Sequence, residues 1–209
     1  MSATANTSSP SPTAATGPTS SSAAALALHL GIGEQGKLLA LAGDHREALI
    51  HYRAAIRLAV EQQAPEVFFR HYMECSLESL ERMGSFMEVL EYCDRALDHY
   101  TRVPLDSLPE ATRPLVRRDL AHVHLRRGAC LLKLGERDLA REALAACLAC
   151  EAGPMPLASS LMQWLRSGWH CDVARIVAEQ QRHGYFTVRK DNVDPARARE
   201  LPAALRPPI

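Results

Sequence analysis

Apolar side chains along residues 29–184 recur at the three- to four-residue spacing of amphipathic helices, and glycines interrupt this pattern. One order of elements repeats: a helical stretch ends on a glycine, a short turn follows, and a second amphipathic stretch begins. Glycine suits the left-handed backbone position that ends a helix. The pattern therefore predicts that residues 24–184 are overwhelmingly helical, as antiparallel helix pairs that turn near Gly43, Gly84, Gly135 and Gly168.

The second helix of each pair carries small or apolar residues on one face. In two pairs, Asp44 or Ser85 follows the turn glycine and is placed to cap the next helix. The apolar face predicts six residues buried between hairpins: Tyr52, Ala55, Ile56, Leu97, Leu144 and Leu148.

This arrangement resembles the tetratricopeptide repeat, in a variety with long repeats. Gly36 and Gly128 stand at the family's small position in the first helix, and Leu39 and Leu131 stand at its large position. The resemblance covers roughly residues 29–184. It implies an all-α fold, a right-handed superhelical stack of antiparallel helical hairpins.

The spacing of the turns departs from the family period of 34 residues. Gly43 and Gly84 are 41 residues apart, Gly84 and Gly135 are 51 apart, and Gly135 and Gly168 are 33 apart. The longest interval contains three prolines, so we expect a long loop between hairpins at Thr101–Pro114.

The two ends of the chain differ from its centre. Residues 1–22 are uncharged and offer almost nothing to bury, so we expect them to be disordered. The helical repeat domain is expected over residues 23–185. Four prolines in residues 186–209 predict an irregular C-terminal tail with room for one short helix.

Charge and composition exclude several classes of protein. The 24 basic and 24 acidic residues balance, so no global field attracts nucleic acid or an anionic membrane. No apolar run is long enough for membrane insertion, and the first charged residue is Glu34, which argues against a secretory signal. Six scattered cysteines favour a cytoplasmic protein with free thiols.

Candidate chemistry is sparse. Cys147 and Cys150, with His170 and Cys171 downstream, come nearest to a metal set. However, Cys147 occupies a position where the repeat pattern needs a small buried side chain, so packing is the preferred interpretation. No glycine-rich phosphate loop, HExxH or GxSxG is present. We therefore expect no enzyme activity, no cofactor and no metal, although a Cys–His catalytic pair stays open.

Charged side chains form two stripes on predicted first helices. One stripe is acidic (Glu74, Glu78 and Glu81), and the other is basic (Arg118, His122 and Arg126). The resemblance places first helices along a concave groove that binds partners. The expected partner-binding residues are Lys37, Arg70, His71, Glu74, Glu78, Arg118, His122, Arg126 and Lys133. The alternative is a solvated face whose charges pair with one another.

These features favour a non-enzymatic adaptor that binds another protein or peptide in its groove. The family's carboxylate clamp for chaperone tails is not expected, because only Lys37 has a suitable character among the corresponding positions. Two alternatives remain. The neutral Ser/Thr/Pro-rich N-terminus resembles the export signals of type III effectors, so a secretion-linked effector or chaperone is one. A metal-dependent enzyme is the other.

Overall fold

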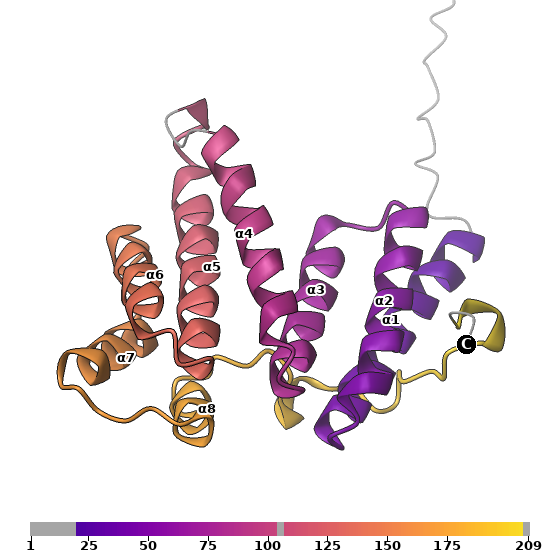
Figure 1. Cartoon of the computed structure of the whole chain (residues 1–209). Helices are drawn as coiled ribbons and strands as arrows, with labels where there is room; N and C mark the ends of the chain where they lie inside the picture. Colours follow the sequence, from indigo (N-terminus) through magenta and orange to yellow (C-terminus); the bar gives the residue numbers. More distant parts are fainter. Residues whose placement is uncertain (1–19, 104–106, 207–209) are drawn as a thin grey trace, which may run out of the picture.

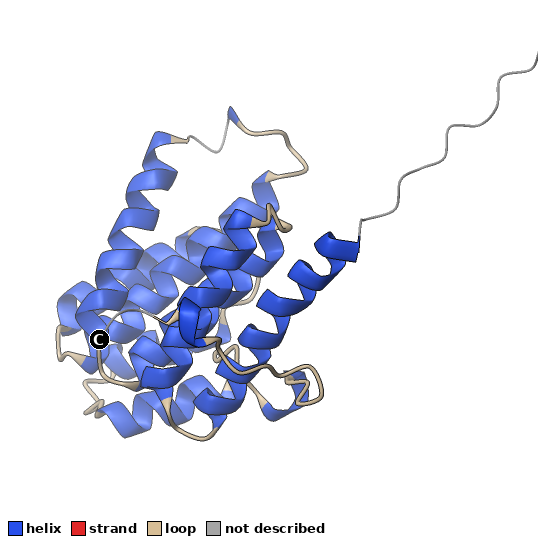
Figure 2. Ribbon diagram, turned by 90° about the vertical axis from the view of Figure 1, so that its right-hand side faces the viewer, coloured by secondary structure: helices blue, strands red, loops and turns tan. Residues whose placement is uncertain are grey.

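The computed structural model describes residues 20–103 and 107–206. The predicted disordered tail therefore lies mostly outside the described residues, and the first helix begins at Ser20, three residues before the predicted domain boundary. The described ranges contain helices and loops but no strand (Figures 1 and 2). The helices are α1 (Ser20–Leu41), α2 (His45–Glu61), α3 (Glu66–Arg82), α4 (Phe86–Arg102), α5 (Arg113–Lys133), α6 (Arg137–Ala149), α7 (Pro156–Arg166) and α8 (Val173–Arg182).

The four predicted turns are confirmed. Gly43, Gly84, Gly135 and Gly168 separate the members of four successive helix pairs, and all four have positive φ. At the first turn, the Asp44 N–H donates to the Leu39 carbonyl, which satisfies one of the last carbonyls of α1. Neighbouring helices along the chain pack against one another, so the all-α class is confirmed. The right-handed superhelical stacking stays a prediction.

Only one of the two predicted helix caps forms. The Asp44 carboxylate accepts a hydrogen bond of 3.1 Å from the Glu47 N–H and so caps α2. Ser85 stands at the cap position of α4, but its side chain makes no capping hydrogen bond.

The predicted core face is largely correct. Tyr52, Ala55 and Leu144 are fully buried, whereas Ile56 and Leu97 are half-buried. The prediction for Leu148 is wrong, because its side chain is 39% exposed. The buried stripe of α6 ends at Cys147, and a residue one position further is turned by about 100° around the helix axis.

Two glycines allow close packing within the hairpins. A Cβ atom on Gly36 would lie 2.6 Å from Cε1 of Tyr52, and one on Gly128 would lie 2.8 Å from Cγ of Leu144. These distances are shorter than van der Waals contact. The first helix of each of these hairpins can therefore approach the second only where it has no side chain.

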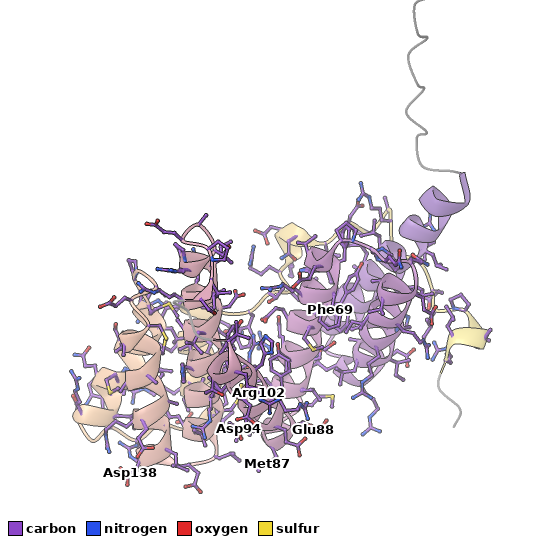
Figure 3. The ribbon with its side chains drawn as sticks, turned by 90° about the horizontal axis from the view of Figure 1, so that it is seen from above. Phe69, Met87, Glu88, Asp94, Arg102 and Asp138 are labelled. Atoms are coloured by element: carbon purple, nitrogen blue, oxygen red, sulfur yellow. The ribbon has the colours of Figure 1, made fainter. Side chains whose placement is uncertain are left out.

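The second hairpin is splayed. Helices α3 and α4 diverge from their turn at Gly84, and α4 leans toward α5 instead (Figure 1). Seen from above, Phe69 and Arg102 belong to the ends of α3 and α4 that lie farthest from this turn (Figure 3). The divergence leaves room between α3, α4 and α5.

The C-terminal residues run back across the molecule. We call residues 185–206 the tail segment. It leaves α8, passes below α5 and α3, and ends beside α1 and α2 (Figure 1). Two short 3-10 turns, η2 (Lys190–Asn192) and η3 (Ala203–Leu205), interrupt it, where the sequence predicted an irregular tail with room for one short helix.

Candidate protein-binding site

The acidic stripe on α3 and the basic stripe on α5 face each other, and one residue of each, Glu74 and Arg126, form an ion pair. The Arg126 guanidinium lies 2.7 Å from the Glu74 carboxylate, and Arg70 lies 2.5 Å from Asp119. Only the Arg126–Glu74 pair joins residues of the two predicted stripes. These two ion pairs therefore hold α3 and α5 together, and their residues also face the space beside the two helices.

A second set of charges lies in the interior. The Glu81 carboxylate accepts hydrogen bonds from Lys133 (2.6 Å), Gln180 (2.7 Å) and the Tyr185 hydroxyl (2.8 Å). The side chains of Glu81 and Lys133 are 0% and 1% exposed. Tyr185 also accepts a hydrogen bond of 3.3 Å from Arg126. This buried network joins α3, α5, α8 and the tail segment.

Several predicted partner-binding residues are therefore covered in this structure by other parts of the chain. Lys133 is buried on Glu81, and Arg126 is 9% exposed. Lys37 and Glu78 are buried beneath the tail segment, which they contact directly. The physical reason is common to all four: each charge is taken out of water only where an intrachain partner compensates it.

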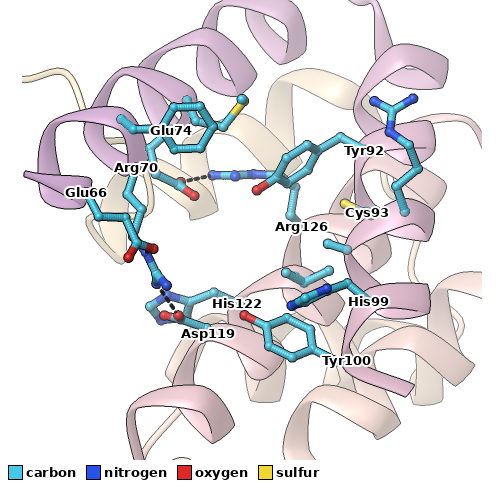
Figure 4. Close-up of a pocket in the computed structure, with 15 residues that line it drawn as sticks. Glu66, Arg70, Glu74, Tyr92, Cys93, His99, Tyr100, Asp119, His122 and Arg126 are labelled. Carbon is cyan, nitrogen blue, oxygen red and sulfur yellow. Dashed lines mark hydrogen bonds and ion pairs between the residues drawn. The ribbon is translucent and has the colours of Figure 1, made fainter. Parts of the chain in front are cut away.

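One cavity of about 500 Å³ lies in the splayed hairpin (Figure 4). Its walls come from α3, α4 and α5. They combine apolar and aromatic surface with charges of both signs, including Phe69, Arg70, Tyr92, Tyr100, Asp119 and His122.

A second cavity of about 520 Å³ lies on the other side of the Arg126–Glu74 ion pair. Both residues of the pair, together with His122, line both cavities. The remaining walls come from α5, the loop that leads into α7, the start of α7 and the residues that follow α8, and include Arg118, Met155 and Tyr185. The ion pair is thus a partition between two adjacent hollows.

The predicted site residues at these cavities differ in availability. Arg118 and His122 are exposed, and neither makes a hydrogen bond or ion pair among the residues that the structure describes. Arg70 is exposed, but Glu66 and Asp119 both accept hydrogen bonds from it. His71 is half-buried and lies 3.7 Å from the Cys75 sulfur. Arg118 and His122 are the two predicted residues best placed to meet a partner.

The charge states of the Arg126–Glu74 pair and of His122 follow from their surroundings. Burial alone would raise the pKa of Glu74, but Arg126, followed by His122 and His71, lowers it overall. His122 is exposed as a whole residue, but partial desolvation of its ring in the cavity wall, followed by the charge of Arg118, lowers its pKa. At neutral pH the cavities are therefore bordered by a charged Arg126–Glu74 pair and a neutral imidazole.

Stability is expected to fall as the pH drops from 7 to 5. Burial lowers the pKa of His29, whose ring is fully buried with Nδ1 2.8 Å from the Tyr72 hydroxyl. Below about pH 6.5 the unfolded chain binds a proton at this residue that the folded chain excludes, so protonation favours unfolding. Burial also lowers the pKa values of four other histidines, so their protonation favours unfolding in the same way: His45, His71, His122 and His124.

Urea unfolding at pH 7 and pH 5 checks this expectation. The raised pKa of Glu78 acts in the opposite direction, so the comparison includes a His29→Gln variant. The variant should lose less stability between the two pH values than the wild type does. An equal loss in both proteins would show that His29 contributes nothing to the pH dependence.

The cysteines show no sign of activation. All six are free, and burial raises the pKa of the Cys75, Cys93 and Cys147 thiols to about 12. Thiols with such values stay protonated at neutral pH and behave as small apolar side chains. Over residues 20–103 and 107–206, the acidic, histidine and cysteine side chains form no group of three or more that could hold a metal ion.

No helix in the described part of the chain has the length and apolar character needed to cross a membrane. Comparison with models of known protein families finds no match. Searches of curated proteins and of solved structures also find no match.

Proposed function

We propose that this protein is a non-enzymatic adaptor that binds a segment of another protein at the two cavities beside the Arg126–Glu74 ion pair. The observation that carries this proposal is the pair of adjacent hollows with a shared wall. A chain segment laid across the ion pair can place one side chain in each hollow. The tetratricopeptide-like superhelical stack belongs to the same proposal, since it would align the first helices along one face.

The chemistry of the walls supports a partner with mixed character. Phe69 is 36% exposed, and Tyr92 and Tyr100 line the same cavity, so an apolar side chain finds aromatic surface there. Arg118, which lines the second cavity, offers a bidentate guanidinium to a carboxylate. The partner segment would therefore carry an apolar residue close to an acidic one.

A photo-crosslinking residue tests the site. Placed at position 69 in the full chain, it should capture the partner in cells of the native host. The same residue at position 139 is the control, because Leu139 is 43% exposed on α6 and lines neither cavity. Equal capture from both positions would contradict the proposed site.

Arg118→Glu is expected to weaken partner binding at least about tenfold, since a charge-assisted hydrogen bond is replaced by repulsion. The matched control is Arg53→Glu, the same charge reversal at an exposed position on α2. Binding is measured by titration of the captured partner, and the wild-type affinity should fall as salt rises. Unchanged affinity in the Arg118 variant would rule out a role for the second cavity.

A further inference from the structure

Charged side chains of α1 and α3 hold the backbone of the tail segment. The Glu78 carboxylate accepts a hydrogen bond of 2.8 Å from the Val188 N–H. Lys37 donates one of 3.2 Å to the Asn192 carbonyl, and Glu34 accepts one of 2.8 Å from the Asp194 N–H. These contacts are made to main-chain groups, so they depend on the backbone conformation of the tail segment, including its η2 turn, and not on a particular side chain.

Three apolar side chains of the tail segment also pack on the helices. Phe186 lies against the Arg82 guanidinium, which is 3.6 Å from the ring centroid. Val188 is buried in a cluster with Tyr52 and Cys75, and Leu201 is buried in a second cluster beside α1 and α2. Most side chains between Val188 and Leu201 are exposed. The tail segment is thus anchored at its two ends and held by its backbone between them.

Helix α1 is shaped for this contact. A Cβ atom on Gly31 would lie 2.5 Å from Cγ of Arg199 and 2.8 Å from the Arg197 carbonyl oxygen. The Arg199 N–H donates to the Gly31 carbonyl, a hydrogen bond of 3.0 Å. Glycine is less favourable than alanine inside a helix, but at Gly31 the missing side chain allows the tail segment to approach.

The surface beneath the tail segment combines apolar residues with three charged side chains, Glu34, Lys37 and Glu78. Burial raises the pKa of the Glu78 carboxyl, so covering this group has a cost. Without the tail segment, Glu34, Lys37 and Glu78 would regain water. A partner that replaces the tail segment would have to cover the apolar surface that Val188 and Leu201 cover here. Short stretches with few buried side chains are also the parts of a protein that open most readily.

We propose that this surface of α1 and α3 is a peptide-binding site, that the tail segment is its intramolecular ligand, and that a segment of a partner with a similar backbone conformation replaces it. The fitting partner has an aromatic residue two positions before a β-branched aliphatic residue, as Phe186 precedes Val188. Glu34, Lys37 and Glu78 line neither cavity, although the tail segment contributes Tyr185 to the wall of the second one. The test uses a peptide of the tail segment, so its outcome is read without the partner proposed for the cavities.

The test uses the full chain and a fluorescent peptide of residues 185–206 as the probe. In the wild type, the attached tail competes at an effective concentration of about millimolar, so the free peptide should bind weakly. The variant Val188→Asp/Leu201→Asp removes both buried anchors and places a carboxylate against Glu78. It should bind the free peptide at least about tenfold more tightly, measured by fluorescence anisotropy.

Two further variants make this result specific. Ala196→Asp/Ala203→Asp adds the same charge at exposed tail positions and should behave as the wild type. Adding Gly31→Ala to the anchor variant should abolish peptide binding, because the new methyl group meets the peptide backbone. An anchor variant that unfolds, or that stays folded without binding the peptide, would show that the tail segment is part of the core.

Hydrogen exchange of the wild-type chain gives an independent result. The Val188, Asp194 and Arg199 amides should exchange faster than the amides at the centre of α3, because the tail segment opens while the helices stay folded. Exchange of these amides only at the rate of global unfolding would overturn the proposal. Wild-type chains that exchange tails with one another at high concentration would identify the occupant as a second copy instead of a partner.

Discussion

Replacing Lys133 with methionine is expected to lower the free energy of unfolding by about 3–5 kcal/mol. Methionine fills a similar volume but removes the charge that compensates Glu81, whose carboxylate is fully buried. Gln180 and Tyr185 would still donate to this carboxylate, but neither carries a positive charge. The variant and the wild type are compared by urea unfolding monitored by circular dichroism.

Removing one partner of an exposed ion pair is expected to cost much less stability than removing one partner of a buried pair. Arg141→Met is the matched control, because Arg141 pairs with Asp138 at 2.5 Å while both side chains face water. Its expected cost is at most about 1 kcal/mol. Replacing Lys133 and Glu81 together with methionine should recover part of the lost stability, since no unpaired charge stays inside. Equal costs for Lys133→Met and Arg141→Met would show that the interior pair is hydrated.

Ala55→Arg is expected to cost about 3–5 kcal/mol, because it forces a charge and extra volume into packed space. Ala55 is fully buried on α2, in a cluster that also contains Ile32 and Tyr72. Ala145→Arg makes the same change at an exposed position of α6 and should be tolerated. Thermal unfolding separates them: an Ala55 variant that melts within about a degree or two of the wild type would contradict the described packing.

The hairpins could be predicted from the sequence because their signals are local. A turn needs a glycine with positive φ, and Gly43 is followed at once by the capping residue Asp44. Burial was predictable at the centre of the apolar stripe, as at Tyr52 and Leu144. It failed at Leu148, because the buried stripe ends at Cys147 and the next position is turned about 100° around the helix axis.

The candidate site was predictable only in part. Helical spacing placed Glu74 and Arg126 on facing helices, and they do meet. It gave no sign that Arg126 would be buried, because its cover includes Tyr185, which is 59 residues further along the chain. Asp119 could have been found, since it adjoins the basic stripe at Arg118 and pairs with Arg70. The path of the tail segment could not be predicted, because many of its long-range contacts are made through its backbone, which any sequence offers.

The contact between Gly31 and Arg199 has a consequence for synthesis of the protein. These residues are 168 positions apart, and ribosomes add roughly 5–20 residues per second, so α1 is made about 8–34 s before its contact is complete. Helices form in about a microsecond and collapse in microseconds to tenths of a millisecond. The first two hairpins therefore have time to fold while the chain is still being elongated, with Glu34, Lys37 and Glu78 facing water. A nascent chain would pass through the uncovered form of this surface every time the protein is made.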